Sequence, residues 1–226
     1  AWYGRAVPDA AGLAACAKLR GGLAGISAER IWAETRKLLA APQPLAALDA
    51  MESTGVLDQL FSEAKDLKLL RKLVGLDIRE GFAPDPMVRF LALFWKDATA
   101  VHDVANRMKM SNDERHRLNW AVQDETPLWG GVTAHEVRAA LYRLGQQTIR
   151  DRLMLEWAGD GSADWAEVLA LVDAWQRPTV PVTGADLLQN GLTQGPALGE
   201  ALRKLETAWI ESDFTLSQSE LLALVK

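Results

Sequence analysis

Four basic residues at helical spacing are the side chains of this sequence best suited to bind phosphate groups. They are Lys65, Lys68, Arg71 and Lys72. They occupy one face of an expected helix whose opposite face is apolar. Lysine and arginine neutralise phosphates without reading base sequence, so such a face suits contact with a nucleic-acid backbone. The alternative interpretation is the solvated side of an ordinary amphipathic helix.

Four arginines further along form a second candidate for phosphate contact. They are Arg138, Arg143, Arg150 and Arg152. The only acids in this stretch are Glu136 and Asp151. Arg143 and Arg150 would share a face if a single helix continued through Gly145. The sequence therefore allows a second basic surface, conditional on that continuous helix.

A glycine-rich turn is the third candidate. Gly195-Pro196 precedes an amphipathic stretch in which Gly199 is the next glycine. Proline suits the first turn of a helix, where the backbone amide has no helical partner. Backbone amides at a helix start can bind phosphate, so the turn could let an RNA backbone approach. The alternative is a plain turn between helices.

Residues that could support catalysis do not form a recognisable site. His102-Asp103 is the type of pair found in metal-dependent phosphohydrolases, but no histidine precedes it, and His116 and His135 fall in other helices. Two-metal phosphoryl transfer needs clustered carboxylates, and no Gly-Ser or Gly-Gly turn leads into an Asp-x-Asp strand. We therefore predict no catalytic residue and no metal site in this chain, and interpret the histidines as surface or core residues.

The elements that must position these residues are almost all helices. We expect them at about 9–20, 27–41, 44–54, 63–74, 85–95, 98–109, 112–124, 134–157 (with a break at Gly145 left open), 163–176, 184–190, 196–211 and 218–225. Capping boxes mark three of the starts, at Ser111, Thr133 and Ser217. The fold class predicted is all-α: an irregular helical bundle with a small helical tail. Two prolines in 178–183 indicate a linker between a body at 1–177 and a tail at 184–226.

Composition sets limits on partner and location. The 226 residues carry a net charge of −5, with an excess of acids in the last third. The nine tryptophans are expected mainly in the core, and the single cysteine, Cys16, as a small buried side chain. No run of eighteen apolar residues and no leader segment is apparent. We therefore expect a cytoplasmic protein with no membrane partner.

Two separated segments resemble one protein family. Residues 181–214 read Pro-x-Thr-Gly-x-Asp-Leu, Gly-x-x-x-Gly-Pro-x-x-Gly and Leu-x-x-Leu-Glu. Residues 25–39 carry a Ser-x-Glu-Arg-Ile helix motif with Ser27, Glu29, Arg30 and Glu34, in which Ser27 is an expected helix cap and Arg30 and Glu34 can pair. The 25–39 segment resembles the neck, and the 181–214 segment the tail, of bacterial CCA-adding tRNA nucleotidyltransferases and the related poly(A) polymerases. The two follow each other along the chain in the same order as in that family.

The resemblance implies a neck, body and tail that hold tRNA or another RNA 3′ end. It also implies that the family's catalytic head, with its Mg²⁺ ions and CTP or ATP, would precede residue 1, so we expect no cofactor in this chain and no catalysis by it alone. The residues that separate CCA addition from poly(A) addition would lie in that head. The alternative function is a helical protein-interaction scaffold without a nucleic-acid partner.

Overall fold

The protein is all-α throughout the part of the chain that the structure describes, which confirms the predicted fold class. The computed structural model describes residues 2, 8–64, 66–123, 131–161 and 165–225. In these residues the helices are α1 (Ala10–Leu19), the 3-10 helix η1 (Arg20–Gly25), α2 (Ala28–Leu39), α3 (Leu45–Ser53), α4 (Val56–Leu60), α5 (Lys68–Glu80), α6 (Pro86–Leu91), α7 (Ala98–Arg107), α8 (Asn112–Gln123), α9 (Ala134–Leu144), α10 (Gln146–Asp160), α11 (Trp165–Asp173), α12 (Gly184–Gln189), α13 (Pro196–Glu211) and α14 (Gln218–Ala223). Among the described helices, none is long and apolar enough to span a bilayer.

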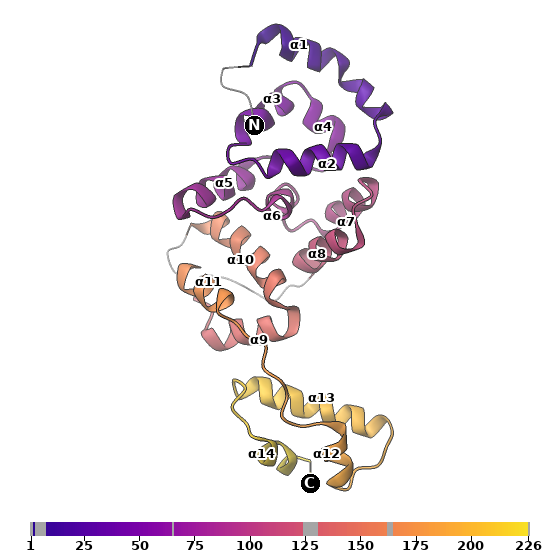
Figure 1. Ribbon diagram of the computed structural model, residues 1–226, viewed down its shortest axis with the longest axis vertical. Helices are drawn as coiled ribbons and strands as arrows, with labels where there is room; N and C mark the ends of the chain where they lie inside the picture. The colour runs from indigo at the N-terminus through magenta and orange to yellow at the C-terminus, as the bar shows by residue number, and fades with distance from the viewer. Residues whose placement is uncertain (1, 3–7, 65, 124–130, 162–164, 226) are drawn as a thin grey trace.

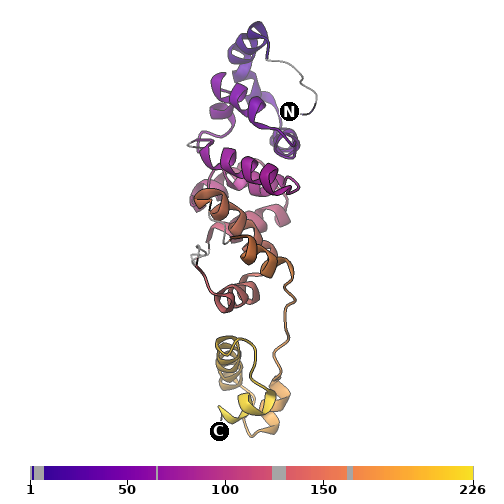
Figure 2. The same ribbon diagram turned by 90° about the vertical axis from the view of Figure 1, so that its left-hand side faces the viewer.

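The helices form an elongated stack rather than a sphere. Helices α1–α4 lie at one end, α5–α11 in the middle and α12–α14 at the other end (Figures 1 and 2). Figure 1 places α5 and α11 on one side of the middle section and α7 and α8 on the other. The molecule therefore presents long lateral surfaces, on which an extended partner can lie.

One hydrophobic core runs from α2 to α11 and has α10 at its centre. Helix α10 contacts α5, α6, α8, α9 and α11. It is enclosed on most sides, because its buried residues include Leu153, Met154 and Leu155, three consecutive positions that point in different directions around the helix. Such a helix has to be enclosed by other elements to keep its apolar surface from water. The central position of α10 thus follows from its own sequence.

A second core belongs to the tail but includes part of the body. It buries Leu187, Leu205 and Trp209 of the tail together with Ala139 and Tyr142 of α9. The Tyr142 and Trp209 rings meet edge to face at 5.8 Å between centroids. The tail is therefore packed onto α9 as well as tethered through the 178–183 segment.

Two predicted helices differ from expectation at their ends, since α5 runs to Glu80 instead of 74 and α6 ends at Leu91 instead of 95. Two other boundaries have a local cause. Helix α5 begins at Lys68, not near residue 63, because the Asp66 carboxylate accepts the amide hydrogen of Lys68 at 2.8 Å and starts the helix there. Gly145, with φ 84° and ψ 155°, ends α9 and precedes α10. Glycine adopts positive φ without strain from a Cβ, so the break falls at this residue.

Some smaller elements and side chains also differ from expectation. The short helices η1 and α4 were not predicted. Ser27 occupies the cap position of α2 but its side chain makes no capping hydrogen bond. The capping boxes at Thr133 and Ser217 are confirmed, and so is the one at Ser111, where the Ser111 hydroxyl accepts the amide hydrogen of Glu114 at 3.3 Å and the Glu114 carboxylate accepts that of Ser111 at 2.9 Å. Cys16 is exposed, because no residue of α1 is buried.

Candidate nucleic-acid interface

The exposed side of α5 carries three of the four basic residues first considered. Lys68, Arg71 and Lys72 are all exposed, whereas Leu70 and Leu73, on the other side of the helix, are buried. The helix therefore has the predicted amphipathic division. Lys65 falls outside the described residues. Figure 2 shows α5 on the side of the molecule that faces the viewer.

The three cations have partners, although none is withdrawn from solvent. Lys68 Nζ lies 3.3 Å from Asp66. Arg71 Nη2 lies 2.5 Å from Asp49 and 3.7 Å from Glu52, and the hydrogen bond with Asp49 raises the pKa of Arg71. Exposed pairs of this kind contribute only about 0–1 kcal/mol, so they can exchange for a phosphate.

Lys72 is held differently from its two neighbours. Its Nζ donates to the carbonyl oxygen of Gly159 at 2.8 Å, near the end of α10. A carbonyl satisfies one donor of the ammonium group without neutralising its charge. Lys72 therefore keeps its positive charge at the place where α5 meets α10.

The second group of arginines does not form one surface. Because α9 ends before Gly145 and α10 begins after it, the continuous helix needed to align Arg143 with Arg150 does not exist. Arg138 binds Asp213 in the tail, with Nε at 2.7 Å from Oδ1, and Arg150 Nε lies 3.0 Å from Asp173. Arg143 is exposed. Arg152 is buried, so it is not available to a phosphate. The predicted second basic surface is therefore wrong.

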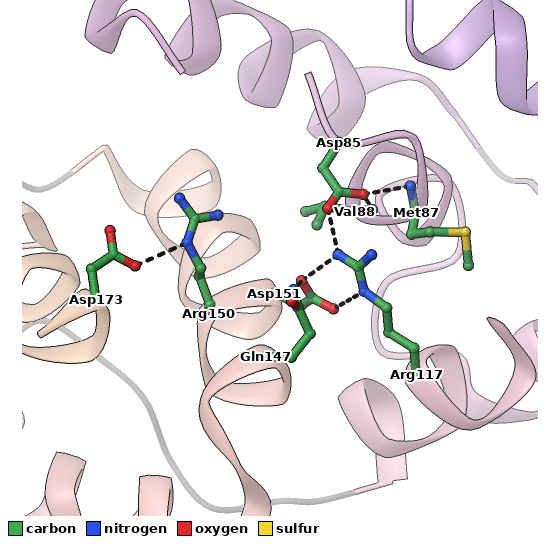
Figure 3. Close-up of polar contacts among 8 residues, drawn as sticks. All are labelled: Asp85, Met87, Val88, Arg117, Gln147, Arg150, Asp151 and Asp173. Carbon is green, nitrogen blue, oxygen red and sulfur yellow. Dashed lines mark hydrogen bonds and ion pairs between the residues drawn. The ribbon is translucent and has the colours of Figure 1, made fainter. Parts of the chain in front are cut away.

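Asp151, which follows Arg150 in the sequence, belongs to a buried polar network. Asp151, fully buried, accepts two hydrogen bonds from Arg117, at 2.7 and 2.8 Å (Figure 3). The same guanidinium contacts Asp85 at 2.5 Å, so α6, α8 and α10 are joined. Burial raises the pKa of Asp151, against the effect of its bonds from Arg117. Figure 3 shows Arg150 pointing away from this network toward Asp173.

The glycine turn before α13 has the geometry that its sequence indicates. Gly195 has φ 150° and ψ −170° and is followed by Pro196 at the first position of α13, and no side chain caps this helix start. Gly199 lies within the first turns of the helix. The turn is formed, and its contact with phosphate stays a prediction.

The motif on α2 is exposed and makes a different ion pair from the one expected. Glu29 pairs with Lys109 at 3.0 Å. Backbone hydrogen bonding, followed by the bond from Lys109, lowers the pKa of Glu29. Arg30 and Glu34 are both exposed, and no ion pair joins them among the described contacts. Within the described residues, moreover, no group of three or more His, Cys, Asp or Glu side chains could hold a metal ion.

Comparison with known proteins shows which proteins this chain resembles. Residues 9–68 match the model of a family described as the probable RNA and SrmB-binding site of polymerase A. The chain is 28% identical to the mitochondrial CCA tRNA nucleotidyltransferase 1 of Mus musculus and 26% identical to that of Homo sapiens, in each case over 100% of this chain and 53% of the relative. The protein of the same name from Danio rerio is 26% identical over 89% of this chain and 47% of the relative.

The chain is therefore a homologue of the CCA tRNA nucleotidyltransferases, as the two sequence motifs predicted. It spans about half the length of the curated relatives it matches. These relatives come from animals, so the expected likeness to bacterial members stays a prediction.

The matched segment 9–68 also contains exposed basic residues that our sequence analysis did not single out. Lys18, Arg20 and Lys37 lie within it and are exposed. Their signal was weak, because acids are interspersed with them and they form no helical stripe. Of the residues that we predicted to bind RNA, only Lys65 and Lys68 fall inside this segment.

Proposed function

We propose that this chain is the RNA-binding portion of a template-independent RNA nucleotidyltransferase. In this role it holds tRNA, or another RNA 3′ end, against a catalytic head that binds Mg²⁺ and CTP or ATP, in the cytoplasm. The observation that carries the proposal is the relation to CCA tRNA nucleotidyltransferases over the whole chain, together with the RNA-binding family matched at 9–68. The described residues do not fit a two-metal site, so no catalytic step is assigned to them.

The shape and the exposed basic side of α5 support this proposal. An elongated stack of helices offers a lateral surface to a duplex, and duplex RNA is recognised mostly by shape and by contacts to phosphates and 2′-hydroxyls. Such contacts need exposed Lys and Arg rather than a closed pocket. Lys68, Arg71 and Lys72 provide them on one helix.

One observation favours a second function, a helical protein-interaction scaffold. Many of the body's cations are paired with carboxylates, as in Arg107 with Glu63 and Lys96 with Glu156. A surface of balanced charges suits a protein partner as well as it suits a nucleic acid. The salt dependence of binding separates the two functions.

The test is titration of tRNA at 50 and 200 mM salt. Each phosphate contact adds about −0.7 to −0.9 to the slope of log K against log salt. Lys68→Glu/Lys72→Glu should weaken binding at low salt and flatten the slope by roughly 1.5. The matched control, Lys109→Glu/Arg115→Glu, makes the same charge change between α7 and α8 and within α8, two helices that Figure 1 places on the other side of the body from α5.

The result expected is a loss for the α5 variant and a smaller change for the control. If the unmodified chain does not bind tRNA at low salt, the proposed function is wrong. If the control loses more affinity than the α5 variant, RNA binds the other side of the body.

A further inference from the structure

Gly75 lies at the centre of the exposed side of α5, a position at which glycine does not stabilise a helix. It lies in the middle of a helix that spans Lys68–Glu80 and has no positive φ. Glycine in a helix interior is less stable than alanine because it loses more backbone freedom on folding. A glycine at such a position calls for a reason in packing or in binding.

Packing within the chain gives no such reason. A Cβ built on Gly75 meets nothing within 4 Å among the described residues. The residue is exposed, whereas Leu73, Val74 and Leu76 beside it are buried. Neither a close helix contact nor an unusual backbone conformation therefore requires glycine here.

The side chains around Gly75 are mainly basic. Residues three and four positions away are its neighbours on the helix surface, and these are Arg71, Lys72, Ile78 and Arg79. Ile78 is 55% exposed. Lys68 lies on the same side, two turns earlier. Gly75 is thus a bare strip of helix backbone bordered by cations and one apolar side chain.

Carboxylates border the same surface and mark its edges. Asp49 and Glu52 lie beside Arg71, at 2.5 and 3.7 Å, and Glu80 lies 2.7 Å from Arg79. All three acids are partly exposed. Lys72 has a backbone carbonyl as its partner rather than a carboxylate. In the described contacts, Lys72 is therefore the one of these cations whose charge is not paired with a carboxylate.

We propose that Gly75 is the point at which the sugar–phosphate backbone of RNA lies directly against the backbone of α5. The missing side chain lets the strand approach, Lys72 and Arg79 then contact successive phosphates, and Ile78 packs against a ribose. A second protein helix could also use a glycine for close approach, but the bordering cations favour a polyanion. This inference rests on the proposed RNA-binding function.

The experiment adds side chains at Gly75 and measures stability and tRNA binding separately. Gly75→Ala should raise the unfolding midpoint by roughly 2–4 °C, since alanine is the better helix former, and should weaken tRNA binding. Gly75→Gln should weaken binding by about tenfold or more, equivalent to ~1.4 kcal/mol. The control is Ala134→Gln, which adds a comparable side chain at the exposed first position of α9, a helix that Figure 1 places at the end of the middle section away from α5. It should leave binding unchanged.

Stability that rises while affinity falls supports the proposal, because glycine is then kept for the RNA. Gly75→Gln binding tRNA as tightly as the unmodified chain overturns it, and so does a lower midpoint for Gly75→Ala. An unmodified chain that self-associates, with variants that dissociate but keep their tRNA affinity, would assign the face to a second copy instead. In each of these cases the unmodified chain still binds tRNA, so the proposed function survives. The proposed function is wrong only if the unmodified chain does not bind tRNA.

Discussion

Replacement of the buried Arg89 by methionine should be the most destabilising of the single changes considered. Arg89 is 1% exposed, and its guanidinium contacts Asp77 Oδ2 at 2.9 Å through Nε and 2.8 Å through Nη2. Its Nη1 donates to the carbonyl oxygens of Leu39 and Ala41 at 2.8 and 2.6 Å. One side chain on α6 therefore neutralises a buried acid of α5 and donates hydrogen bonds to two carbonyl groups at the end of α2.

The magnitude follows from what the substitution leaves behind. Breaking a buried ion pair by removing one partner costs about 3–5 kcal/mol. The share due to Asp77 has a ceiling, because the carboxyl can take up a proton instead of staying charged. With an ordinary pKa of 3.8, protonation costs about 4.4 kcal/mol at pH 7 and about 1.6 kcal/mol at pH 5. The two carbonyls that lose their donor add a contribution that does not depend on pH.

The sign of the pH dependence is fixed by Asp77. Burial already raises the pKa of Asp77 in the intact protein, although its hydrogen bond from Arg89 opposes the shift. Without Arg89 that pKa rises further, so the variant loses stability as pH increases from the unfolded value of 3.8 toward the folded value. The penalty should thus be smaller at pH 5 than at pH 7, by as much as ~2.7 kcal/mol.

Urea denaturation at both pH values measures this effect. The double variant Asp77→Leu/Arg89→Met removes the acid as well, so it should be more stable than Arg89→Met at pH 7, and more stable by a smaller margin at pH 5. A penalty below about 1 kcal/mol, typical of an exposed pair, would refute the reasoning. A penalty that does not change with pH would show that the carboxylate is not its source.

Three further outcomes follow from the geometry. Asp49→Asn/Glu52→Gln removes two acids beside the proposed RNA face and should raise tRNA affinity roughly two- to tenfold at low salt, measured by titration; unchanged affinity would place the RNA elsewhere. The hydrogen bond from Arg138 lowers the pKa of Asp213. The intact protein should therefore be more stable than Asp213→Asn above pH 3.8, and this difference should disappear as the pH falls through the lowered pKa. Thermal unfolding from pH 2 to 7 measures the difference, and a difference that stays constant contradicts the prediction. Gly145→Ala should cost about 1–3 kcal/mol because of its positive φ, measured in urea, and a neutral result would mean that the break tolerates a side chain.

Local sequence signals predicted the helical fold well. Capping boxes at Thr133 and Ser217 depend on residues three positions apart, so they can be read directly from the sequence. The start of α5 could not be read in the same way, because it depends on the Asp66 side chain accepting one particular amide hydrogen. The short helices η1 and α4 have too few residues to show a helical period.

The surroundings of the basic residues were much less predictable. Arg71 and Asp49 are 22 positions apart, and Arg138 and Asp213 are 75 positions apart. Only the packed helices bring such pairs together. Asp151 was counted as an acid near a basic surface, although it is buried against Arg117. Periodicity finds which side of a helix faces solvent, but it does not find the partner from a distant element.

The net charge of −5 limits the way in which this chain can bind RNA. A protein without excess positive charge gains little from long-range attraction, which is screened beyond about 10 Å at 0.1 M salt. Affinity then has to come from close contacts, in which a cationic side chain touches a phosphate directly. Close contact is what a bare helix backbone at Gly75 permits, since it lets Lys72 and Arg79 reach a strand that a longer side chain would hold away. We therefore expect the missing side chain at Gly75 to contribute to RNA binding together with the basic side chains around it.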